Sequence, residues 1–388
     1  MNPMIAQIKN LPDLVHQVVP AYSANIASTL SREFCQSFDH LYLMGCGDSH
    51  HVSLATQLAF RVLAGIETEA LTAMHFARYI VDSLQHPQRC LVAGASVSGE
   101  VSRTLEGMLL ARKAGAQVLA LTATPTSRIA RAADVVVDTT QPPFQDPEGM
   151  VIPGVRSYVA NQVGLLLLAI YFGEQRGHIS QKEADRYHQL IYNLADAINS
   201  TIEMNEKLVK DLANQWAEED EFIFCGSGPG YAAALFSAAK ILEASGDAAL
   251  GQDLEEWAHL QYFAKKVSTP TFIISGGERD GSRAREVVTA ALAIGRRVAV
   301  ITPIEKTGLF PEAAVKLPVV NGVPEMFHAL LTMLPGSLFA AYRAELLSEP
   351  YFRDFGGRRS KEGGGGISRI RTSETLGLEY LKEDSHDT

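Results

Sequence analysis

The second half of this sequence repeats the first at an offset of about 180 residues. Gly45-Cys46-Gly47 recurs as Gly226-Ser227-Gly228, and the apolar run Leu91–Gly94 recurs as Phe272–Ser275. A pattern of glycine, valine and threonine with matching spacing also occurs twice, as Gly115-x-x-Val118-x-x-x-Thr122 and Gly295-x-x-Val298-x-x-x-Thr302. Several matches in one register predict two domains of common ancestry, which limits the chain to folds that occur as a tandem pair.

Each repeat alternates short apolar runs with amphipathic stretches. In the first copy the expected strands cover residues 41–44, 66–71, 91–95, 118–122 and 135–138, with helical patterns between most of them. This alternation is typical of a parallel sheet that is covered by helices on both faces. We therefore expect an α/β fold of two doubly wound, flavodoxin-like parallel-sheet domains, in which ligands bind beyond the carboxyl ends of the strands.

The flanking segments are expected to be helical. Apolar residues recur at helical spacing before and after Pro12, which interrupts the pattern, and a second helix is predicted from Ser23 to Phe34. The run Val163–Phe172 is predicted to be a buried helix in the stretch that joins the copies. The expected segments are 1–36 (N-terminal helices), 37–195 and 196–348 (the two domains), and 349–388 (the tail).

Composition and charge narrow the class of protein. With 388 residues, 46% of them hydrophobic, the chain is long enough for two full cores. Its net charge of -10 argues against nucleic acid as the main partner. The four cysteines lack metal-like spacing and fit a reducing compartment. The N-terminus has no signal-peptide pattern, and no apolar run approaches about 18 residues. We therefore expect a cytoplasmic protein without a membrane partner.

The stretch Leu91–Glu100 combines an apolar strand with a hydroxyl-bearing loop, Ser96-Val97-Ser98-Gly99-Glu100, which precedes an amphipathic helical pattern. One interpretation is a simple helix cap, in which Ser98 satisfies one backbone N–H group. The other is a phosphate site, because hydroxyls and N–H groups at the positive end of a helix suit a dianion. The copy, Ser275–Gly281, has lost the Ser-x-Ser-Gly pattern. Only the first domain is therefore expected to bind phosphate in this way.

The turn Gly45-x-Gly47-x-x-His50 also allows two interpretations. With Glu67 lying 20 residues beyond Gly47, it resembles a dinucleotide fingerprint, which would imply a nicotinamide cofactor. However, His50 stands where the third glycine belongs and would impede close packing of helix on strand. We favour a tight turn that lets the backbone and Ser49 approach a sugar, with no cofactor.

Two residues of the second domain are candidates for acid–base chemistry. Glu243 ends an apolar helical run, where a carboxylate is often only a solvated helix-end residue. His259 is a lone histidine of the kind that is often structural. A carboxylate with a raised pKa and a histidine with a pKa near neutrality would nevertheless make a workable pair. The adjacent His50 and His51 do not face one metal on a helix, and no metal site is expected.

The tail has an unusual composition. Glycines and basic residues occur in Gly356–Gly366, and Ile367–Glu374 follows with basic and hydroxyl residues. One interpretation is a disordered linker. The other is a loop that folds over an anionic ligand.

Together these motifs resemble those of double-SIS (sugar isomerase) proteins, over residues 4–375 or so. The chain is similar to the isomerase half of glucosamine-6-phosphate synthase and to related bacterial phosphosugar isomerases and deglycases. The family's Cys-Gly-Thr-Ser turn appears as Cys46-Gly47-Asp48-Ser49, and its Ser-Gln-Ser-Gly-Glu-Thr loop appears as Ser96-Val97-Ser98-Gly99-Glu100-Val101. Its Gly-Val-Ala-Ser segment appears as Gly154-Val155-Arg156-Ser157. The family's catalytic glutamate follows a lysine and precedes a histidine by 16 residues, and Lys240-Ile-Leu-Glu243 and His259 keep that spacing.

The resemblance implies a sugar 6-phosphate site that needs no cofactor. Ser96 and Ser98 would hold the phosphate together with backbone N–H groups, and Glu243 would move a proton between C1 and C2. His259 would assist ring opening; in the relatives it comes from the neighbouring subunit, so a homodimer with shared active sites is implied. The resemblance also assigns substrate or phosphate binding to Cys46, Gly47, Ser49, Val97, Val101, Val155 and Ser157.

The sequence departs from the family at several of these positions. Val97 replaces a glutamine, and Val101 replaces the phosphate-loop threonine, a lost hydroxyl for which Ser102 or Arg156 would have to compensate. Arg369 stands in place of a lysine that helps to open the sugar. Arginine cannot form a Schiff base, but it can pair with a phosphate or another acidic group. Lys361 is the alternative replacement.

The leading hypothesis is therefore an aldose–ketose isomerase, deaminase or deglycase for an amino-sugar or amine-linked sugar 6-phosphate. Its candidate catalytic residues are Glu243, His259 and Arg369. No cysteine nucleophile follows Met1, so synthesis of glucosamine 6-phosphate from glutamine is not expected. The alternative hypothesis is a non-catalytic sugar-phosphate sensor, because SIS modules also serve in regulators.

Overall fold

The computed structural model describes residues 2–356 and 370–380, and the chain forms two compact units that are each discontinuous in sequence. The β1–β5 unit comprises Gln17–Pro142, Ala160–Ile191 and the chain from Phe355 onward. The β6–β10 unit comprises Met1–His16, Pro143–Val159 and Tyr192–Asp354. These units are defined by contacts in space. The sequence boundaries expected at residues 36, 195 and 348 stay a prediction.

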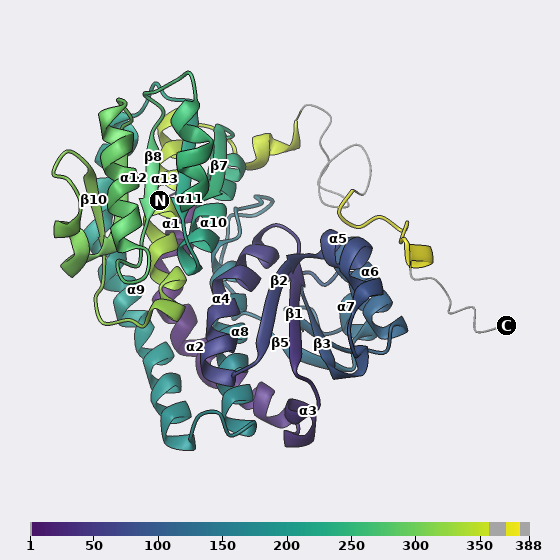
Figure 1. The fold of residues 1–388 in the computed structure, drawn as a ribbon. Helices are drawn as coiled ribbons and strands as arrows, with labels where there is room; N and C mark the ends of the chain where they lie inside the picture. Colours follow the sequence, from purple (N-terminus) through teal and green to yellow (C-terminus); the bar gives the residue numbers. More distant parts are fainter. Residues whose placement is uncertain (1, 357–369, 381–388) are drawn as a thin grey trace. The chain divides into compact units, whose positions relative to one another are not determined.

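The first unit is built on a parallel sheet of five strands in the order β2-β1-β3-β4-β5 (Figure 1). The strands are β1 (His40–Gly45), β2 (Glu67–Thr72), β3 (Cys90–Ala95), β4 (Gln117–Thr122) and β5 (Val135–Asp138). This strand order is the flavodoxin-like one, in which the chain reverses direction across the sheet between β1 and β3. The predicted α/β fold is thus confirmed.

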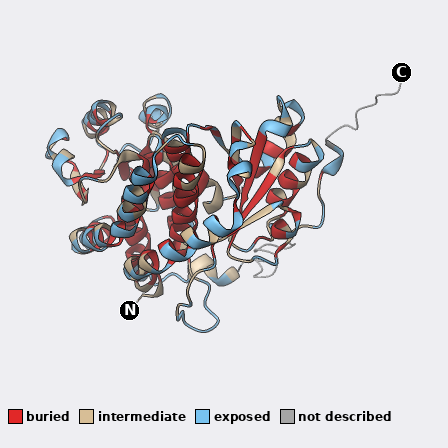
Figure 2. Ribbon diagram, turned by 90° about the horizontal axis from the view of Figure 1, so that it is seen from below, coloured by how far each residue is buried: buried red, intermediate tan, exposed pale blue. Residues whose placement is uncertain are grey.

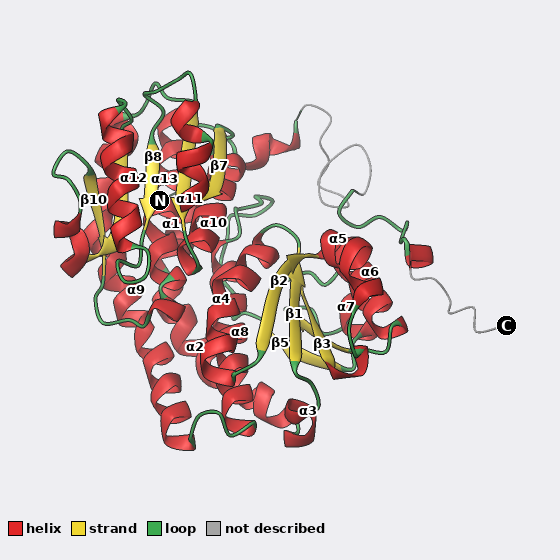
Figure 3. Ribbon diagram, viewed as in Figure 1, coloured by secondary structure: helices red, strands yellow, loops and turns green. Residues whose placement is uncertain are grey.

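Helices cover both faces of this sheet (Figure 3). Helix α4 (Asp48–Ala64) packs on β1 and β2, whereas α6 (Ser102–Lys113) and α7 (Arg128–Ala132) pack near β3 and β4. All six residues of β3 are buried, which explains its continuous apolar sequence. One core cluster joins Met44, Val92 and Val118 of the strands to Phe76 and Met108 of the helical face. Figure 2 shows the strands largely in the buried class.

The second unit repeats this architecture. Its sheet has the order β10-β9-β8-β6-β7, which is the same order when counted from its own first strand. The strands are β6 (Glu221–Gly226), β7 (Ala248–Asp253), β8 (Thr271–Ile274), β9 (Val298–Pro303) and β10 (Val315–Val319). The helices include α10 (Pro229–Ala244), α11 (Leu254–His259), α12 (Gly281–Ala293) and α13 (Ala329–Leu347). Corresponding strands lie about 180 residues apart, as the repeat predicts.

The helices outside the two sheets differ in part from the prediction. Helices α1 (Pro3–Lys9), α2 (Leu11–Thr29) and α3 (Arg32–Gln36) replace the expected break at Pro12 and second helix from Ser23 to Phe34. Pro12 lies in the first turn of α2, where proline is tolerated because that N–H group has no helical partner. The chain instead breaks at Asn10, which caps α1, and at Ser31, whose hydroxyl accepts the N–H of Phe34.

Two long helices, α8 (Val155–Gln175) and α9 (Gln181–Gln215), connect the copies. Val163 and Phe172 are both fully buried, so the predicted buried helix is confirmed. Among the described residues, α8 is the one helix that is long and apolar enough to cross a membrane, and 89% of its apolar window is buried inside the protein. Core helices of soluble proteins have the same length and composition.

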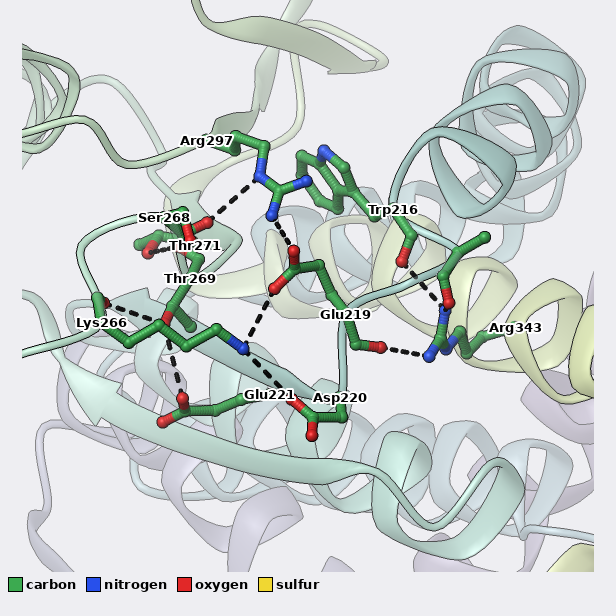
Figure 4. A network of polar contacts seen from close by, with 11 residues as sticks. Trp216, Glu219, Asp220, Glu221, Lys266, Ser268, Thr269, Thr271, Arg297 and Arg343 are labelled. Carbon is green, nitrogen blue, oxygen red and sulfur yellow. Dashed lines mark hydrogen bonds and ion pairs between the residues drawn. The ribbon is translucent and has the colours of Figure 1, made fainter.

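Charged residues form a closed network where β6, β8 and β9 begin (Figure 4). Glu219 pairs with Arg297 and, at 3.2 Å, with Lys266, which also lies 3.1 Å from Asp220. Burial alone would raise the pKa of Glu219, but hydrogen bonds from Arg297 and Lys266 lower it overall. Arg343 donates to the backbone oxygens of Trp216 at 3.0 Å and Ala217 at 2.7 Å. These charged groups pair with one another at the amino ends of the strands. In sheets of this kind ligands bind at the opposite edge, beyond the carboxyl ends.

Candidate functional site

The two loops singled out in the first domain follow neighbouring strands. β1 and β3 pair in parallel along residues 40–44 and 90–94, so Gly45 and Ala95 end at one edge of the sheet. The Gly45 turn and the Ser96 loop (Ser96–Val101) therefore lie beside each other at the point where the chain changes direction, where open α/β sheets bind ligands. Gly47 caps α4 with φ 54° and ψ −128°, and its counterpart Gly228 caps α10 with φ 53° and ψ −128°.

The Ser96 loop is fixed by the segment that follows β4. The N–H of Ser96 donates to Leu121 O at 3.0 Å, and Val97 O accepts the N–H of Ala123 at 3.1 Å. Gly99 has φ +66°, and a Cβ atom there would lie 1.9 Å from Ser127 Oγ, so only glycine fits. Ser127 itself is buried, and its role was not predicted from the sequence. The loop is thus held in a single conformation before any ligand arrives.

Several donors of this loop remain available. Ser96 Oγ accepts the N–H of Gly99 at 3.1 Å, and Ser98 Oγ accepts the N–H of Glu100 at 3.3 Å, so both hydroxyl hydrogens are free to point outward. Within the described part of the chain, the N–H groups of Val97, Ser98 and Val101 make no hydrogen bond. Val101 is the N-cap of α6 and offers no side-chain acceptor. Unused donors at the positive end of a helix are suited to bind an anion.

The C-terminal segment lies against the same helix end. The N–H of Ser102 donates to Arg371 O at 2.9 Å, and Ser102 Oγ donates to Ser373 O at 2.5 Å. Glu374 lies 3.7 Å from Arg128, which follows the β4 loop. The hydroxyl of Ser102 is therefore engaged by the tail, which argues against its replacing the hydroxyl lost at Val101. Residues 371–374 thus bring the tail to the Ser96 loop.

A buried carboxylate anchors the tail beyond this point. Glu106 on α6 is fully buried and pairs with both Arg78 and Arg103, and Arg103 also donates to Thr375 O. Burial alone would raise the pKa of Glu106, but hydrogen bonds from Arg78 and the backbone of Gly377, with the charge of Arg103, lower it overall. The sequence signal for this anchor is a charged residue on the apolar side of a helix, and Glu106 was not among the predicted site residues.

The Gly45 turn brings a thiol and a hydroxyl to this edge. Cys46 Sγ lies 4.0 Å from Thr104 Oγ1 on α6, and burial raises the pKa of the thiol, so it stays protonated near neutral pH. The N–H of Ser49 donates to Cys46 O at 3.2 Å, and the Ser49 side chain is half-buried. Ser49 and the neutral Cys46 thus both lie at the edge where a ligand is expected, and their binding roles stay predictions.

The dinucleotide interpretation of this turn conflicts with the strand register. A ribose-binding carboxylate has to lie at the carboxyl end of the second strand. Glu67 is instead the first residue of β2, paired in register with His40, and its carboxylate lies 3.0 Å from His40 Nε2. Because Gly45 pairs with Thr72 at the far end of these strands, Glu67 lies at the opposite edge from the turn. It cannot serve as the ribose ligand.

The segment Gly154–Ser157 belongs to the β6–β10 unit. Val155 is fully buried at the start of α8, and a Cβ atom at Gly154 would lie 2.7 Å from Ser157 Oγ. The guanidinium of Arg156 lies 4.6 Å from the centre of the Phe144 ring. Arg156 therefore has an aromatic contact within its own unit.

Glu243 is half-buried and ion-paired. It occupies the last turn of α10, with 28% of its side chain exposed, and its carboxylate pairs with Lys240 one turn earlier. Lys240 is fully buried, and its ammonium lies 4.7 Å from the centre of the Phe236 ring. The buried ammonium of Lys240 thus holds the Glu243 carboxylate in place at the end of the helix. Lys240 is therefore part of the candidate site. The sequence indicated this role only through the spacing of Lys240 from Glu243.

A second cation closes the end of this helix. Arg353 donates to Leu242 O at 3.2 Å and to Glu243 O at 3.3 Å, and it also contacts Ala244 O. These are carbonyls of the last turn, which have no partner inside the helix. The backbone that carries Glu243 is consequently fixed on both sides of the residue.

His259 is an exposed candidate residue at the end of a helix. It ends α11, 64% of its side chain is exposed, and Nε2 lies 3.2 Å from Glu255 Oε1 on the same helix. Glu255 is also held by Arg283, with an Nε–Oε2 distance of 2.6 Å. The imidazole is therefore oriented from its own helix and presented to solvent.

The candidate residues fall into three groups. Seven lie at the two loops of the β1–β5 unit: Cys46, Gly47, Ser49, Ser96, Val97, Ser98 and Val101. Four belong to the β6–β10 unit: Val155, Ser157, Glu243 and His259. Arg369 and its alternative Lys361 lie outside the described residues. The described part of the chain contains no group of three or more His, Cys, Asp or Glu side chains placed to hold a metal ion.

The copy of the Ser96 loop keeps the backbone hydrogen bond that anchors its first serine. Its hydroxyl and N–H donors, however, already have a partner within the loop. The N–H of Ser275 donates to Ile301 O at 3.0 Å, as the N–H of Ser96 does to Leu121 O. Asp280 then accepts the Ser275 hydroxyl at 2.8 Å and the N–H of Gly277 at 3.1 Å. Asp280 is the N-cap of α12, the position that Val101 holds on α6. A carboxylate of the chain itself occupies the anion position in the second unit.

Comparison with known proteins agrees with this architecture. Residues 35–169 match the SIS domain model. The chain is 28% identical, over 321 residues, to the isomerizing glutamine–fructose-6-phosphate aminotransferase of Gloeobacter violaceus, covering 81% of this chain and 50% of that protein. It thus spans about half the length of that relative.

Solved structures show the same fold. The C-terminal domain of glucosamine-fructose-6-phosphate aminotransferase from Francisella tularensis superposes with a TM-score of 0.76 at 16% identity, covering 89% of this chain and 96% of that one. Glucosamine-6-phosphate deaminase from Thermotoga maritima superposes with a TM-score of 0.66 at 19% identity, covering 88% and 94%. Residues 35–169 thus match the SIS domain, and the chain as a whole is similar to proteins named for sugar-phosphate chemistry.

Proposed function

We propose that this protein is a phosphosugar isomerase-type enzyme that acts on an amino-sugar or amine-linked sugar 6-phosphate. The observation that carries the proposal is the set of unused donors in the Ser96 loop, because a preorganised anion site at a helix N-terminus suits a phosphate. Two similar proteins are named for fructose 6-phosphate and glucosamine 6-phosphate. Both names describe hexoses that carry a phosphate on C6.

The proposed roles follow from the chemistry of each group. The N–H groups of Val97, Ser98 and Val101 and the hydroxyls of Ser96 and Ser98 hold the phosphate. Ser49, Val155 and Ser157 line the sugar, and the tail closes over the phosphate loop. Arg369 pairs with a negative charge of the substrate, since arginine cannot form the Schiff base that a lysine could.

Glu243 carries the proton in this proposal. In the open-chain sugar it takes the proton from the carbon next to the carbonyl, which gives an enediol or, with an amino group, an enamine. Return of the proton to the neighbouring carbon completes the isomerisation. Lys240 holds the carboxylate in place for the first step. Loss of ammonia or of an amine from the same intermediate, with addition of water, would give the deaminase or deglycase outcome.

The central test is Glu243→Gln, which keeps the shape of the side chain and removes its basicity. Turnover of glucosamine 6-phosphate, fructose 6-phosphate or a fructosyl-amine 6-phosphate should fall by at least a thousandfold or so, while sugar-phosphate affinity stays within about threefold. Glu256→Gln on the exposed face of α11 is the matched control and should keep full activity. Undiminished turnover in Glu243→Gln would exclude this base. Binding without conversion of any of the three compounds by the wild-type protein would favour the sensor.

His259 is proposed to serve the active site of a second subunit. Its exposed imidazole, held at a fixed orientation by Glu255, is suited to reach a neighbouring molecule. Subunits that carry Glu243→Gln and subunits that carry His259→Asn should each be inactive alone. Mixing them under conditions of subunit exchange should restore part of the activity, because a mixed dimer contains one complete site. Failure to restore activity, with mixed dimers detected by native mass spectrometry, would refute shared active sites.

A further inference from the structure

A cavity of about 210 Å³ opens at the carboxyl edge of the second sheet. It is enclosed by the loops that follow β8, β9 and β10 and by the residue that precedes α13, so it lies where the Ser96 loop lies in the first unit. Its lining residues are Gly276, Glu278, Pro303, Glu305, Lys306, Gly322, Val323, Pro324 and His328. It is smaller than the pockets of about 300–1,000 Å³ that hold drug-sized ligands, which limits it to a molecule no larger than a monosaccharide.

The cavity is unsuited to a phosphate. Asp280 already accepts the hydroxyl and N–H donors that would bind an anion in this loop. Two of the lining residues, Glu278 and Glu305, are acidic, and Glu325 stands close behind Gly276. Burial raises the pKa of Glu325, the charge of Arg279, whose Nε lies 3.1 Å from Glu325 Oε2, opposes this rise, and the negative charges of Asp280 and Glu278 add to it. A site with this surplus of negative charge favours a cation over an anion.

His328 supplies an unused acceptor. It is 6% exposed, and its Nε2 lies 2.5 Å from Val323 O, so this nitrogen carries the hydrogen and donates it. Burial lowers the pKa of His328, so the ring is neutral near pH 7 and Nδ1 is an acceptor. Nδ1 is buried and has no hydrogen-bond partner among the described residues. A Cβ atom added to Gly276, which lines the cavity, would lie 3.0 Å from Nδ1, so Nδ1 faces the cavity wall at Gly276, where only a glycine separates it from the cavity.

One donor complements these acceptors. The ammonium of Lys306 lines the cavity, 3.9 Å from Glu305 Oε1, with 35% of its side chain exposed. The side chains that line the cavity therefore present two carboxylates, one neutral imidazole acceptor and one ammonium donor. A ligand that satisfies them needs a positive amine for the carboxylates and hydroxyl groups for His328 and Lys306.

We infer that this cavity is a second ligand site, which binds a small hydroxylated primary amine of the class of unphosphorylated amino sugars. Its ammonium group lies between Glu278 and Glu305, one hydroxyl donates to His328 Nδ1, and another accepts from Lys306. The duplication has thus produced two sites of opposite preference, one for the phosphorylated end of a sugar and one for an unphosphorylated amine. This inference stands apart from the proposed catalytic site, since it uses residues of the second copy alone.

The test is calorimetric titration of the full-length protein with D-glucosamine. We expect saturable binding that D-glucose, which lacks the amine, reproduces at least tenfold more weakly. Gly276→Ala adds a methyl group in front of Nδ1 at a position without a positive φ, and it should weaken glucosamine binding at least tenfold. Gly308→Ala is the matched control, because nothing lies within 4 Å of the added carbon. Glu278→Gln should weaken binding similarly, whereas the exposed Glu312→Gln should not.

Three results would overturn the inference. They are the absence of binding at millimolar glucosamine, equal affinity in Gly276→Ala and Gly308→Ala, and inorganic phosphate binding that is lost in Gly276→Ala. A crystal structure of the glucosamine complex would decide the location directly. Amine density against Glu278 and Glu305 supports the site, and density confined to the Ser96 loop rejects it. Loss of turnover in Glu243→Gln would bear on the proposed enzyme and not on this cavity.

Discussion

The Ser96 loop and its copy, Ser275–Asp280, share a backbone anchor and differ in what fills them. Each begins with a serine whose N–H donates to the neighbouring strand, to Leu121 O in one case and to Ile301 O in the other. The first loop ends at Val101, which has no side-chain acceptor, and its donors stay open. The second ends at Asp280, whose carboxylate takes up the donors of its own loop. The residue at the helix N-cap thus accounts for the filled donors of the second loop, and the first loop has no such acceptor.

The most direct way to break this comparison is to give the first loop the residue of the second. Val101→Asp should fold, since aspartate is a favoured N-cap. Its carboxylate would occupy the loop donors and repel a phosphate. Each hydrogen bond to a charged group is worth about 1.5–3 kcal/mol, so losing two should weaken glucosamine 6-phosphate binding by at least about a hundredfold. Calorimetry measures this. Val101→Thr is the control and should bind at least as well as wild type; unchanged affinity in Val101→Asp would remove the phosphate from this loop.

The second prediction concerns Glu106, which anchors the tail beside the Ser96 loop. No such anchor is described for the second loop. Glu106→Gln should lower the free energy of unfolding by about 2–3 kcal/mol, because Arg78 and Arg103 lose a buried partner. The pKa of Glu106 is lowered in the folded protein, so its stabilisation is present above the unfolded value and is lost as pH falls through the folded one. Urea unfolding at pH 7 should therefore separate wild type from the variant, and the gap should narrow below about pH 4.5.

Glu69→Gln, on the exposed part of β2, is the control for this series and should leave the unfolding curve unchanged. A gap between Glu106→Gln and wild type that widens on acidification would contradict the assigned ion pairs.

A third experiment compares the two glycines of positive φ, Gly99 and Gly277, by placing alanine at each. Both substitutions cost about 1–2 kcal/mol for the left-handed backbone. At Gly99 the new methyl group also collides with buried Ser127 at 1.9 Å, whereas at Gly277 it meets the flexible side chain of Lys306 at 2.7 Å. Gly99→Ala should therefore weaken glucosamine 6-phosphate binding about tenfold and Gly277→Ala should not. The double variant Gly99→Ala/Ser127→Gly should recover affinity; if it does not, the collision is not the cause.

The smallest effect is expected from Asp280→Asn. Burial raises the pKa of Asp280, although hydrogen bonds from Ser275 and Gly277 partly oppose the shift. An acid with a raised folded pKa loses stability as pH rises from its unfolded value through its folded value. Asparagine keeps an acceptor without that penalty, so the variant should match wild type near pH 3 and gain less than about 1 kcal/mol at pH 7. Thermal unfolding across this pH range is the measurement, and a variant less stable at pH 7 would mean that the charge itself holds the loop.

The sequence predicted the fold well because its signals are local or repeated. Strand runs such as Leu91–Ala95 carry their burial in their composition, and the copies reinforce one another. The position of the two loops follows from strand order alone. The helix boundaries near Pro12 failed because proline is tolerated in a first turn, a distinction that depends on where the helix begins.

The parts of the site that could not be predicted depend on contacts between distant residues. The hydrogen bonds from Ser102 to Arg371 and Ser373 join positions about 270 residues apart. The burial of Lys240 likewise depends on packing around α10. The sequence shows that Asp280 departs from the motif. That its carboxylate accepts the donors of its own loop can be seen only in the folded structure. Nothing near His328 in the sequence signals an unused acceptor.

Each unit is built from separate stretches of the sequence, which limits where the chain can be cut into two stable fragments. Helix α1 belongs to the same unit as α13 and packs on it, with Asn2 Nδ2 donating to Ala341 O at 3.1 Å. A fragment that stops near residue 195 would expose Met4, Ile5 and Ile8 to water, and the remaining fragment would lack their cover. Neither half is therefore a self-sufficient building block. Expressed as separate polypeptides, the halves should therefore be recovered together or not at all.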